Sequence, residues 1–190
     1  MRLILASQSP RRAELLERAG FEFDVVSVQI DEEPLAGETP RAHVARLAAA
    51  KADAVARQLP TRIVLGADTV VVVDNHVLGK PVDDRDAARM LRLLAGRVHE
   101  VLTGVVLREG ARAVSGVDTT RVRLTSLTDE AIAWYVATGE PRGKAGAYAI
   151  QGAASRFVDW IEGSYTNVVG LPVALVDRLM RELISLRAFG

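Results

Sequence analysis

The chain of 190 residues is long enough for one domain with a sizeable core, or for two closely joined lobes. Its 24 basic and 24 acidic side chains give zero net charge, which argues against a nucleic-acid-binding surface spread over the whole protein. No cysteine is present, so disulfides, thiolate nucleophiles and thiolate metal sites are excluded. No apolar run reaches membrane-spanning length and the first residues lack the zones of a signal peptide, so we expect a cytoplasmic protein.

Strand-like and helix-like segments alternate along the chain. Apolar and β-branched runs predict strands near 2–6, 23–28, 63–73, 77–78, 99–108, 112–124 and 157–161. Caps, prolines and helical spacing predict helices from Pro10, over 40–57, 84–94 and 128–138, and through 176–183. The order predicts a mixed α/β fold with many antiparallel pairings. Because no repeat, low-complexity segment or linker interrupts it, we expect a single domain over residues 1–190.

The segment Ser7–Arg12 follows the first strand and opens the first helix. Pro10 suits the first turn of a helix and Ser9 suits the cap before it. Backbone N–H groups, two hydroxyls and the guanidinium groups of Arg11 and Arg12 would then converge at a helix start, which favours phosphate binding. The alternative is a well-capped surface helix with two solvated arginines.

Two charged residues interrupt apolar patterns. Asp68 lies inside the run 63–73, where burial of a carboxylate is costly unless a cation or hydrogen-bond donors meet it. Metal coordination or general-base catalysis would explain it, whereas Gly66 supports an exposed Asp at a turn between two strands. Lys51 lies on the apolar stripe of the helix over 40–57. It could therefore reach a cleft, or extend its ammonium to solvent.

Three further segments carry candidate residues. Lys80, between Gly79 and Pro81, is either part of a structural turn or a rigidly placed cation. The acidic loop over 30–40 is either solvated or supplies a carboxylate to Mg²⁺. The small residues of 144–152 permit close approach of a ligand, and Gln151 has the donor and acceptor needed to read a base edge, although a Gln at a strand edge is otherwise unremarkable.

Several common motifs are missing. The sequence has no Walker loop, no GxGxxG and no GxSxG. His43, His76 and His99 lack metal-ligand spacing, so we expect each of them to be structural.

Together these features resemble the Maf family of nucleoside triphosphate pyrophosphatases. The matching segments span nearly the whole chain, in order: 5–12, 47–52, 66–70, 79–81, Gly96, His99, 101–105, 144–152 and 163–172. The resemblance implies an elongated mixed sheet with flanking helices. It also implies two lobes around a central cleft, a fold related to the inosine triphosphatase superfamily, and a homodimer.

The resemblance also implies a reaction and a set of site residues. Such enzymes cleave a nucleoside triphosphate between the α and β phosphates, giving the monophosphate and pyrophosphate. Asp68 would be the proton acceptor, with Lys51 and Lys80 as catalytic cations. Glu32 and Asp68 would bind a divalent cation, Mg²⁺ first and Mn²⁺ as the alternative, so that Asp68 could be base, metal ligand or both. Substrate binding and specificity would fall to Ser7, Ser9, Arg11, Arg12, Thr69, Lys144 and Gln151.

Substrate choice is the finer expectation. Arg12, Thr69 and Gln151 resemble the branch that acts on dTTP and UTP, and the same activity could extend to modified pyrimidine nucleotides. The alternatives are 7-methyl-GTP or CTP as substrate, or a nucleotide-binding regulator of septum formation and cell division. Gly143 departs from the family pattern, since many members carry an Asp before the lysine, and metal affinity or activity could differ for that reason.

Overall fold

The computed structural model describes residues 2–187, so Met1 and residues 188–190 of the expected domain lie outside the described residues. The strands in that range are β1 (Leu3–Ala6), β2 (Phe23–Val26), β3 (Val64–Val73), β4 (His76–Leu78), β5 (Val98–Glu109), β6 (Arg112–Leu124) and β7 (Val158–Glu162). The α-helices are α1 (Pro10–Arg18), α2 (Pro40–Ala56), α3 (Asp84–Leu94), α4 (Asp129–Ala137), α5 (Tyr165–Val169) and α6 (Val173–Arg187). Two 3-10 helices, η1 (Ala145–Ala147) and η2 (Ala153–Phe157), lie in the segment between α4 and β7.

The described strands form one mixed sheet of seven strands. The strand order is β2-β1-β3-β5-β6-β7, and β4 pairs with β3. Strand β1 is parallel to β2 and β3, whereas the β3–β4 and β6–β7 pairs are antiparallel. The expected mixed α/β fold with flanking helices is therefore confirmed.

The chain divides into two compact units. The first unit comprises residues 1–69, 103–118 and 170–190, and the second comprises residues 70–102 and 119–169. Strands β3, β5 and β6 contribute residues to both units, and the chain also passes from one unit to the other after α5. The expectation of one domain with two lobes around a cleft stays a prediction.

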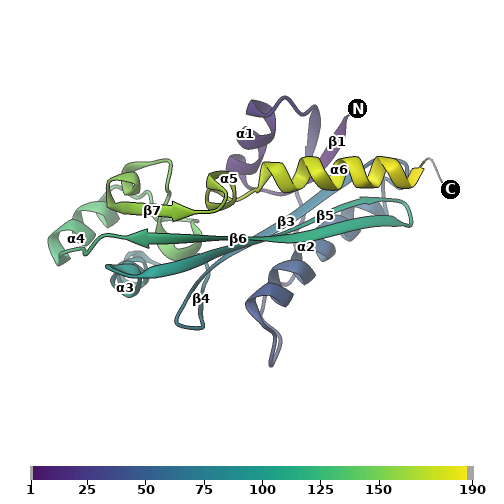
Figure 1. Ribbon diagram of the computed structural model, residues 1–190. Coiled ribbons are helices and arrows are strands. Elements are labelled where there is room, and N and C mark those ends of the chain that lie inside the picture. The colour runs from purple at the N-terminus through teal and green to yellow at the C-terminus, as the bar shows by residue number, and fades with distance from the viewer. Residues whose placement is uncertain (1, 188–190) are drawn as a thin grey trace. The chain divides into compact units, whose positions relative to one another are not determined.

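The sheet in the first unit is buried on both faces. Along β1, Leu3 and Leu5 pack into one apolar cluster, and Ile4 and Ala6 pack into another, as the period of two in a strand requires. The first cluster includes buried residues of α1 and α6, and the second includes buried residues of α2. Figure 1 shows α2 on the face of this part of the sheet opposite to α1 and α6.

Glycines in the first unit let helix α2 lie unusually close to the sheet. A Cβ on Gly66 would sit 2.2 Å from the carbonyl oxygen of Ala48, and a Cβ on Gly104 would sit 2.3 Å from that of Val44. Such distances are far below van der Waals contact, so only glycine fits at either position. Gly66 therefore marks a helix–strand contact rather than the turn that the sequence made credible.

The second unit combines a tight hairpin with a small cluster of aromatic side chains. Asp74 and Asn75 have positive φ values of 47° and 63° and form the turn that links β3 to β4, between the two strands expected over 63–73 and 77–78. The ring of Phe157 lies edge-on to the rings of the exposed Trp134 and the buried Tyr135, with centroid distances of 6.2 and 5.6 Å. These contacts join α4 to the end of η2.

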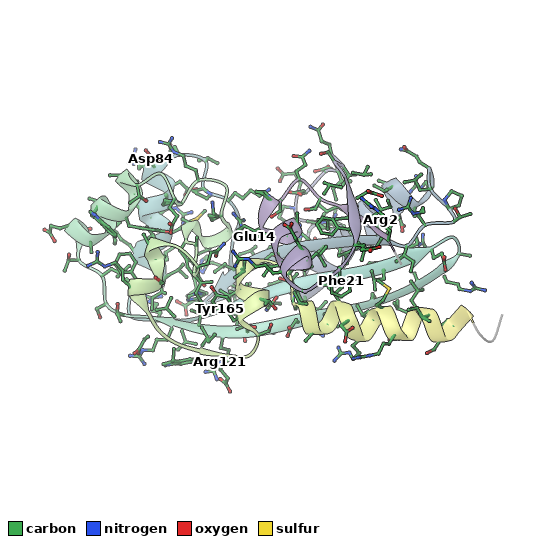
Figure 2. The ribbon with its side chains drawn as sticks, turned by 90° about the horizontal axis from the view of Figure 1, so that it is seen from above. Arg2, Glu14, Phe21, Asp84, Arg121 and Tyr165 are labelled. Atoms are coloured by element: carbon green, nitrogen blue, oxygen red, sulfur yellow. The ribbon has the colours of Figure 1, made fainter. Side chains whose placement is uncertain are left out.

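The surface of each unit carries exposed ion pairs. Arg2 pairs with Asp24 at 2.7 Å in the first unit, and Arg121 pairs with Glu162 at 2.6 Å in the second; Arg2 and Arg121 are labelled in Figure 2. Exposed pairs of this kind add little stability. Within residues 2–187, no helix has both the length and the apolar character needed to cross a membrane.

Candidate active site

Lys51 lies at the centre of a buried ionic cluster in the first unit. Its side chain extends from α2 and is only 8% exposed. Its Nζ lies 2.6 Å from Oδ1 of Asp68 and 2.6 Å from Oε1 of Glu32. The side chain is therefore almost fully buried and contacts two carboxylates, which agrees with its position on the apolar stripe of the helix. The helix face that buries Val44 and Leu47 carries this lysine one turn further along.

Asp68 lies inside a continuous strand and not at a turn. It occupies the fifth position of β3 and is 7% exposed, so the alternative of an exposed aspartate between two strands is wrong. The buried carboxylate is met by a cation, as its cost of burial requires. The contact depends on Gly66, because the close approach of α2 to β3 brings the lysine within reach.

Glu32 joins the cluster from a segment without regular secondary structure. Its side chain is 46% exposed, so one carboxylate of the cluster faces solvent while Asp68 is buried. The acidic loop is therefore partly solvated, as the sequence suggested, but Glu32 is also tied to the helix. Its neighbour Glu33 accepts a hydrogen bond at its carbonyl oxygen from Nη2 of Arg46, at 3.0 Å.

A second ionic group fixes the end of this loop, and sequence reasoning missed it. Glu38 accepts hydrogen bonds from Nε and Nη2 of Arg46 at 2.6 and 2.8 Å and contacts Nδ1 of His43 at 2.9 Å. These contacts, above all those with Arg46, hold the pKa of the Glu38 carboxyl well below its usual range. The available signal was the i, i+3 spacing of His43 and Arg46, which places both on one face of α2.

Arg12 is buried, and most of its hydrogen-bond donors are satisfied within the protein. Its Nε donates to the carbonyl oxygen of Gly170 at 2.9 Å, and Nη1 donates to that of Ala67 at 2.8 Å. Further bonds reach Oγ of Ser7 at 3.3 Å and Oγ1 of Thr69 at 3.1 Å. Since a guanidinium has five N–H donors, these four bonds leave one for any ligand. The alternative of a solvated arginine is wrong for Arg12.

Burial also changes the electrostatics of the helix start. Burial lowers the pKa of Arg12. The nearby carboxylates of Asp68 and Glu32 raise this pKa, but they do not outweigh the effect of burial. The pKa of the half-buried Arg11 is lowered by burial too. Ser9 does occupy the cap position of α1, but its hydroxyl makes no capping bond, and its N–H instead donates to Oγ of Ser7 at 3.1 Å.

Thr69 connects three parts of the first unit. Its hydroxyl lies 2.9 Å from that of Thr103 and 3.3 Å from the carbonyl oxygen of Gly170, in addition to its bond from Arg12. Seven of the candidate residues thus lie in two adjoining networks, one around Lys51 and one around Arg12. Their members are Ser7, Ser9, Arg12, Glu32, Lys51, Asp68 and Thr69.

Of the other four candidates, Arg11 lies in the first unit beside Arg12, whereas Lys80, Lys144 and Gln151 belong to the second unit, so their grouping with Lys51 stays a prediction. Lys80 is exposed and follows Gly79, whose carbonyl oxygen accepts a hydrogen bond from the N–H of Gly146 at 3.0 Å. Nζ of Lys144 donates to the carbonyl oxygen of Arg142 at 3.2 Å. The structure thus joins the backbone after β4 to the segment that begins at Lys144.

The small residues of 144–152 serve internal packing at two positions. A Cβ on Gly146 would lie 2.9 Å from a methyl group of Val71, and one on Gly152 would lie 2.2 Å from Oε2 of Glu140. Close approach in this segment is therefore to the protein itself at these glycines. At Gly143 the backbone has a φ of 69°, which favours glycine, although nothing lies within 4 Å of an added Cβ.

The two carboxylates of the Lys51 cluster suit a hard cation. Glu32 and Asp68 contact one ammonium, so their oxygens are close neighbours. Mg²⁺ is typically bound by one or two carboxylates together with phosphate oxygens and water. Glu32 and Asp68 can supply the two carboxylates. In residues 2–187 there is no group of three or more His, Asp or Glu residues that could hold a metal ion by itself. Any metal here would need oxygens from a ligand.

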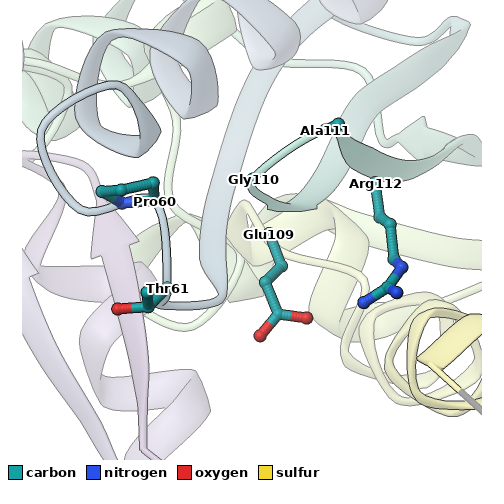
Figure 3. Close-up of a pocket in the computed structure, with 6 residues that line it drawn as sticks. All are labelled: Pro60, Thr61, Glu109, Gly110, Ala111 and Arg112. Atoms are coloured by element: carbon teal, nitrogen blue, oxygen red, sulfur yellow. The ribbon is translucent and has the colours of Figure 1, made fainter. Parts of the chain in front are cut away.

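A surface pocket of about 580 Å³ lies elsewhere in the first unit (Figure 3). It is lined by Pro60, Thr61, Glu109, Gly110, Ala111 and Arg112, from the loop after α2 and the turn between β5 and β6. None of the predicted site residues lines this pocket. This open hollow therefore shares no lining residue with the buried ionic cluster.

His99 is structural, as expected, and its burial has a measurable consequence. Its ring is 1% exposed, Nε2 lies 2.8 Å from the hydroxyl of Tyr148, and burial lowers the pKa of His99 from 6.5 to about 4. The unfolded chain therefore binds a proton more readily than the folded chain between pH 6.5 and pH 4. The stability that neutral His99 gives is complete above pH 6.5 and is lost as the pH falls through this window.

We expect the free energy of unfolding to fall by about 2 kcal/mol more between pH 7 and pH 5 in the natural chain than in His99→Gln. Urea unfolding of both proteins at the two pH values measures the difference. Parallel pH dependences would show that His99 titrates normally in the folded protein.

Comparison with known proteins agrees with the motifs in the sequence. The family model described as Maf-like protein matches residues 2–183. A Koribacter versatilis protein named dTTP/UTP pyrophosphatase is 54% identical over 95% of this chain and 94% of its own. A Shewanella denitrificans protein of the same name is 51% identical, with coverage of 97% and 98%.

A solved structure of the Staphylococcus aureus Ham1 protein is also similar to this chain. It matches with a TM-score of 0.48 and 13% identity, over 65% of this chain and 72% of that protein. The full-length family match and the identities above 50% show that the chain belongs to the Maf family, as its motifs predicted.

Proposed function

We propose that this chain is a nucleoside triphosphate pyrophosphatase, a hydrolase of acid anhydrides that converts dTTP and UTP to the monophosphate and pyrophosphate. The observation that carries the proposal is its identity of more than 50% with relatives named dTTP/UTP pyrophosphatase, over at least 94% of both chains. The buried Lys51–Asp68 pair supplies groups suited to this reaction.

In the proposed reaction, water attacks the α-phosphorus atom. A bond forms between the water oxygen and phosphorus, the bond from phosphorus to the bridging oxygen breaks, and its electron pair leaves with pyrophosphate. Asp68 accepts the water proton. Because Oδ1 of Asp68 is held by Lys51, Oδ2 is the oxygen that would act as base. The cations of Lys51 and Lys80 would stabilise charge that develops on the phosphates.

Glu32 and Asp68 are the residues that would hold a divalent cation, Mg²⁺ first and Mn²⁺ as the alternative. When bound, such an ion neutralises phosphate charge and polarises the phosphoryl oxygens. The ammonium of Lys51 already contacts both carboxylates. It would therefore keep them together before substrate arrives.

The other candidate residues would bind the nucleotide. Thr69, Gln151 and Arg12 are proposed to set substrate choice, with Arg12 acting mainly through its bonds to Thr69 and the strand β3. Contacts to the phosphates are proposed for Ser7, Ser9, Arg11 and Lys144.

Release of pyrophosphate from a nucleotide panel tests the proposal. The purified chain is assayed with Mg²⁺ and with Mn²⁺ on dTTP, UTP, CTP, 7-methyl-GTP, ATP and GTP. We expect the highest kcat/KM for dTTP and UTP. A preference for CTP or 7-methyl-GTP would assign a different substrate within the family, and nucleotide binding without release would favour a regulator.

The cytoplasmic location and the homodimer expected from the sequence stay predictions. Light scattering of the purified chain after size-exclusion chromatography measures the assembly directly. A mass of 20.5 kDa would contradict the dimer.

A further inference from the structure

Gln151 lies on a tight turn in the second unit. The N–H of Gly152 donates to the carbonyl oxygen of Ala149 at 3.0 Å and closes the turn around Ile150 and Gln151. Gln151 is exposed while Ile150 is buried, so the turn presents the glutamine at the surface of its unit. The position of the backbone from Ala149 to Gly152 therefore determines where the side-chain amide of Gln151 lies.

Both sides of the turn are bound by one pair of side chains from α4 and the loop after it. The N–H of Ala149 donates to the hydroxyl of Tyr135 at 3.1 Å. The N–H groups of Ala153 and Ala154 donate to the Glu140 carboxylate at 2.9 and 3.3 Å. The hydroxyl of Tyr135 in turn donates to Oε1 of Glu140 at 2.7 Å. A single Tyr–Glu pair thus holds the residues before and after Gln151.

This pair is fixed in its own position. Tyr135 is fully buried, and burial together with its bond to Glu140 raises the pKa of its hydroxyl, which therefore stays a donor. Burial acts to raise the pKa of Glu140, but the hydrogen bonds from the backbone and from Tyr135 outweigh it, so the pKa is lowered. Gly152 is seated directly against this carboxylate, and no side chain would fit there.

We propose that Tyr135 and Glu140 are positioning residues that set base discrimination by fixing the turn that carries Gln151. The inference rests on the proposed function and on Gln151 as the reader of the base. A side chain that hydrogen-bonds a base must be held in place to reject the wrong one, because a misplaced amide forms equally poor bonds with every base.

The test compares the kcat/KM ratio of UTP to CTP among variants of the full chain. Tyr135→Phe removes one hydroxyl and leaves the ring. We expect it to lower the ratio by about 5- to 100-fold, the discrimination that a good pair of hydrogen bonds to a base provides. Gln151→Ala should lower the ratio similarly, and the double variant should lose little more, because both changes remove one shared interaction.

Tyr148→Phe is the matched control. It also removes a buried tyrosine hydroxyl from the second unit, but that hydroxyl contacts Nε2 of His99 and not the turn. We expect it to lower stability and to keep the UTP to CTP ratio. Glu140→Gln keeps the size of the side chain and serves as a second variant if Tyr135→Phe does not fold.

Hydrogen exchange gives a readout that does not depend on activity. Peptides that include Ala149, Ala153 and Ala154 should exchange faster in Tyr135→Phe than in Tyr148→Phe, because the turn loses its anchor. If kcat/KM falls equally for all nucleotides, the Tyr–Glu pair is merely structural and the inference is overturned. An unchanged ratio in Gln151→Ala overturns it too.

The two proposals fail in different ways. If the natural chain releases no pyrophosphate from any nucleotide, the proposed function fails and this inference falls with it. If the natural chain prefers UTP and dTTP while the Tyr135 and Glu140 variants keep the full preference, only this inference fails.

Discussion

Asp68→Asn is expected to lower kcat for the preferred nucleotide by at least about 100-fold and to leave the fold intact. General-base catalysis contributes about 10²- to 10⁴-fold, and an amide can neither accept the water proton nor supply a negative charge to a metal. The variant should fold because the ammonium of Lys51 keeps Glu32 as its partner. Rates of pyrophosphate release, together with circular dichroism of the variant, measure both expectations.

Asp53→Asn is the matched control for this experiment. Asp53 also lies in the first unit and pairs with Arg108 at 2.8 Å, but it takes no part in the Lys51 cluster. We expect its rate to stay within a few-fold of the natural chain. A rate in Asp68→Asn close to that of this control would remove Asp68 from the chemistry.

Glu32→Gln separates the two roles proposed for Asp68. If Asp68 is the base and Glu32 only helps to hold the metal, Glu32→Gln should need more Mg²⁺ and recover much of its kcat at saturation. Asp68→Asn should not recover at any Mg²⁺ concentration. Recovery of both variants at high Mg²⁺ would favour metal binding as the main role of Asp68.

Lys51→Met is expected to cause the largest loss of stability, about 3–5 kcal/mol in the free energy of unfolding. The change removes the ammonium that contacts Oδ1 of Asp68 and leaves two neighbouring carboxylates, one of them buried, without the cation between them. Methionine keeps much of the length and volume of the lysine stem, so the loss reports the charge. Urea unfolding at neutral pH measures it.

Arg62→Met is the control for removal of a cation from an ion pair. Arg62 pairs with Asp24 at 3.1 Å, and both side chains are well exposed, so we expect a loss far smaller than that of Lys51→Met. Mg²⁺ should raise the Tm of Lys51→Met more than that of the natural chain, since a divalent cation can replace the missing ammonium between the carboxylates. Equal losses in the two variants would show that the Lys51 cluster is well solvated.

Helix starts and the first hairpin were accessible from the sequence because their signals are local. Thr39 and Thr128 cap α2 and α4 by accepting hydrogen bonds from the N–H groups three residues on, as their positions predict. The turn at Asp74 and Asn75 follows from residues that tolerate positive φ. These features depend on a few neighbouring residues and on backbone geometry.

Gly66 illustrates what local signals miss. In sequence it supports a turn, because glycine most often marks one. In the structure it lies inside β3 and makes room for the carbonyl oxygen of Ala48 in α2. The distance between a strand and a helix that packs on it is a property of the assembled unit, which no local pattern encodes.

The candidate site divides in the same way. The sequence marked Lys51 and Asp68 as unusual, because a charge inside an apolar pattern needs a partner if it is buried, but only the structure shows that the two residues meet at 2.6 Å. The hydrogen bonds of Arg12 could not be predicted from the sequence. Its partners Ala67 and Gly170 are backbone carbonyl groups far away in the sequence, and they have no signature in residue type.

The sequence by itself determined the alternation of strands and helices, the family, and the two charges that interrupt apolar patterns, because periodicity, caps and desolvation cost are read residue by residue. Only the tertiary structure decided that Lys51 contacts Oδ1 of Asp68 and that Arg12 donates its hydrogen bonds within the protein. It also decided that Tyr135 and Glu140 bind the backbone on both sides of Gln151. Hydrogen bonds to backbone groups join residues by position in space, and those positions exist only after the helices and strands have packed.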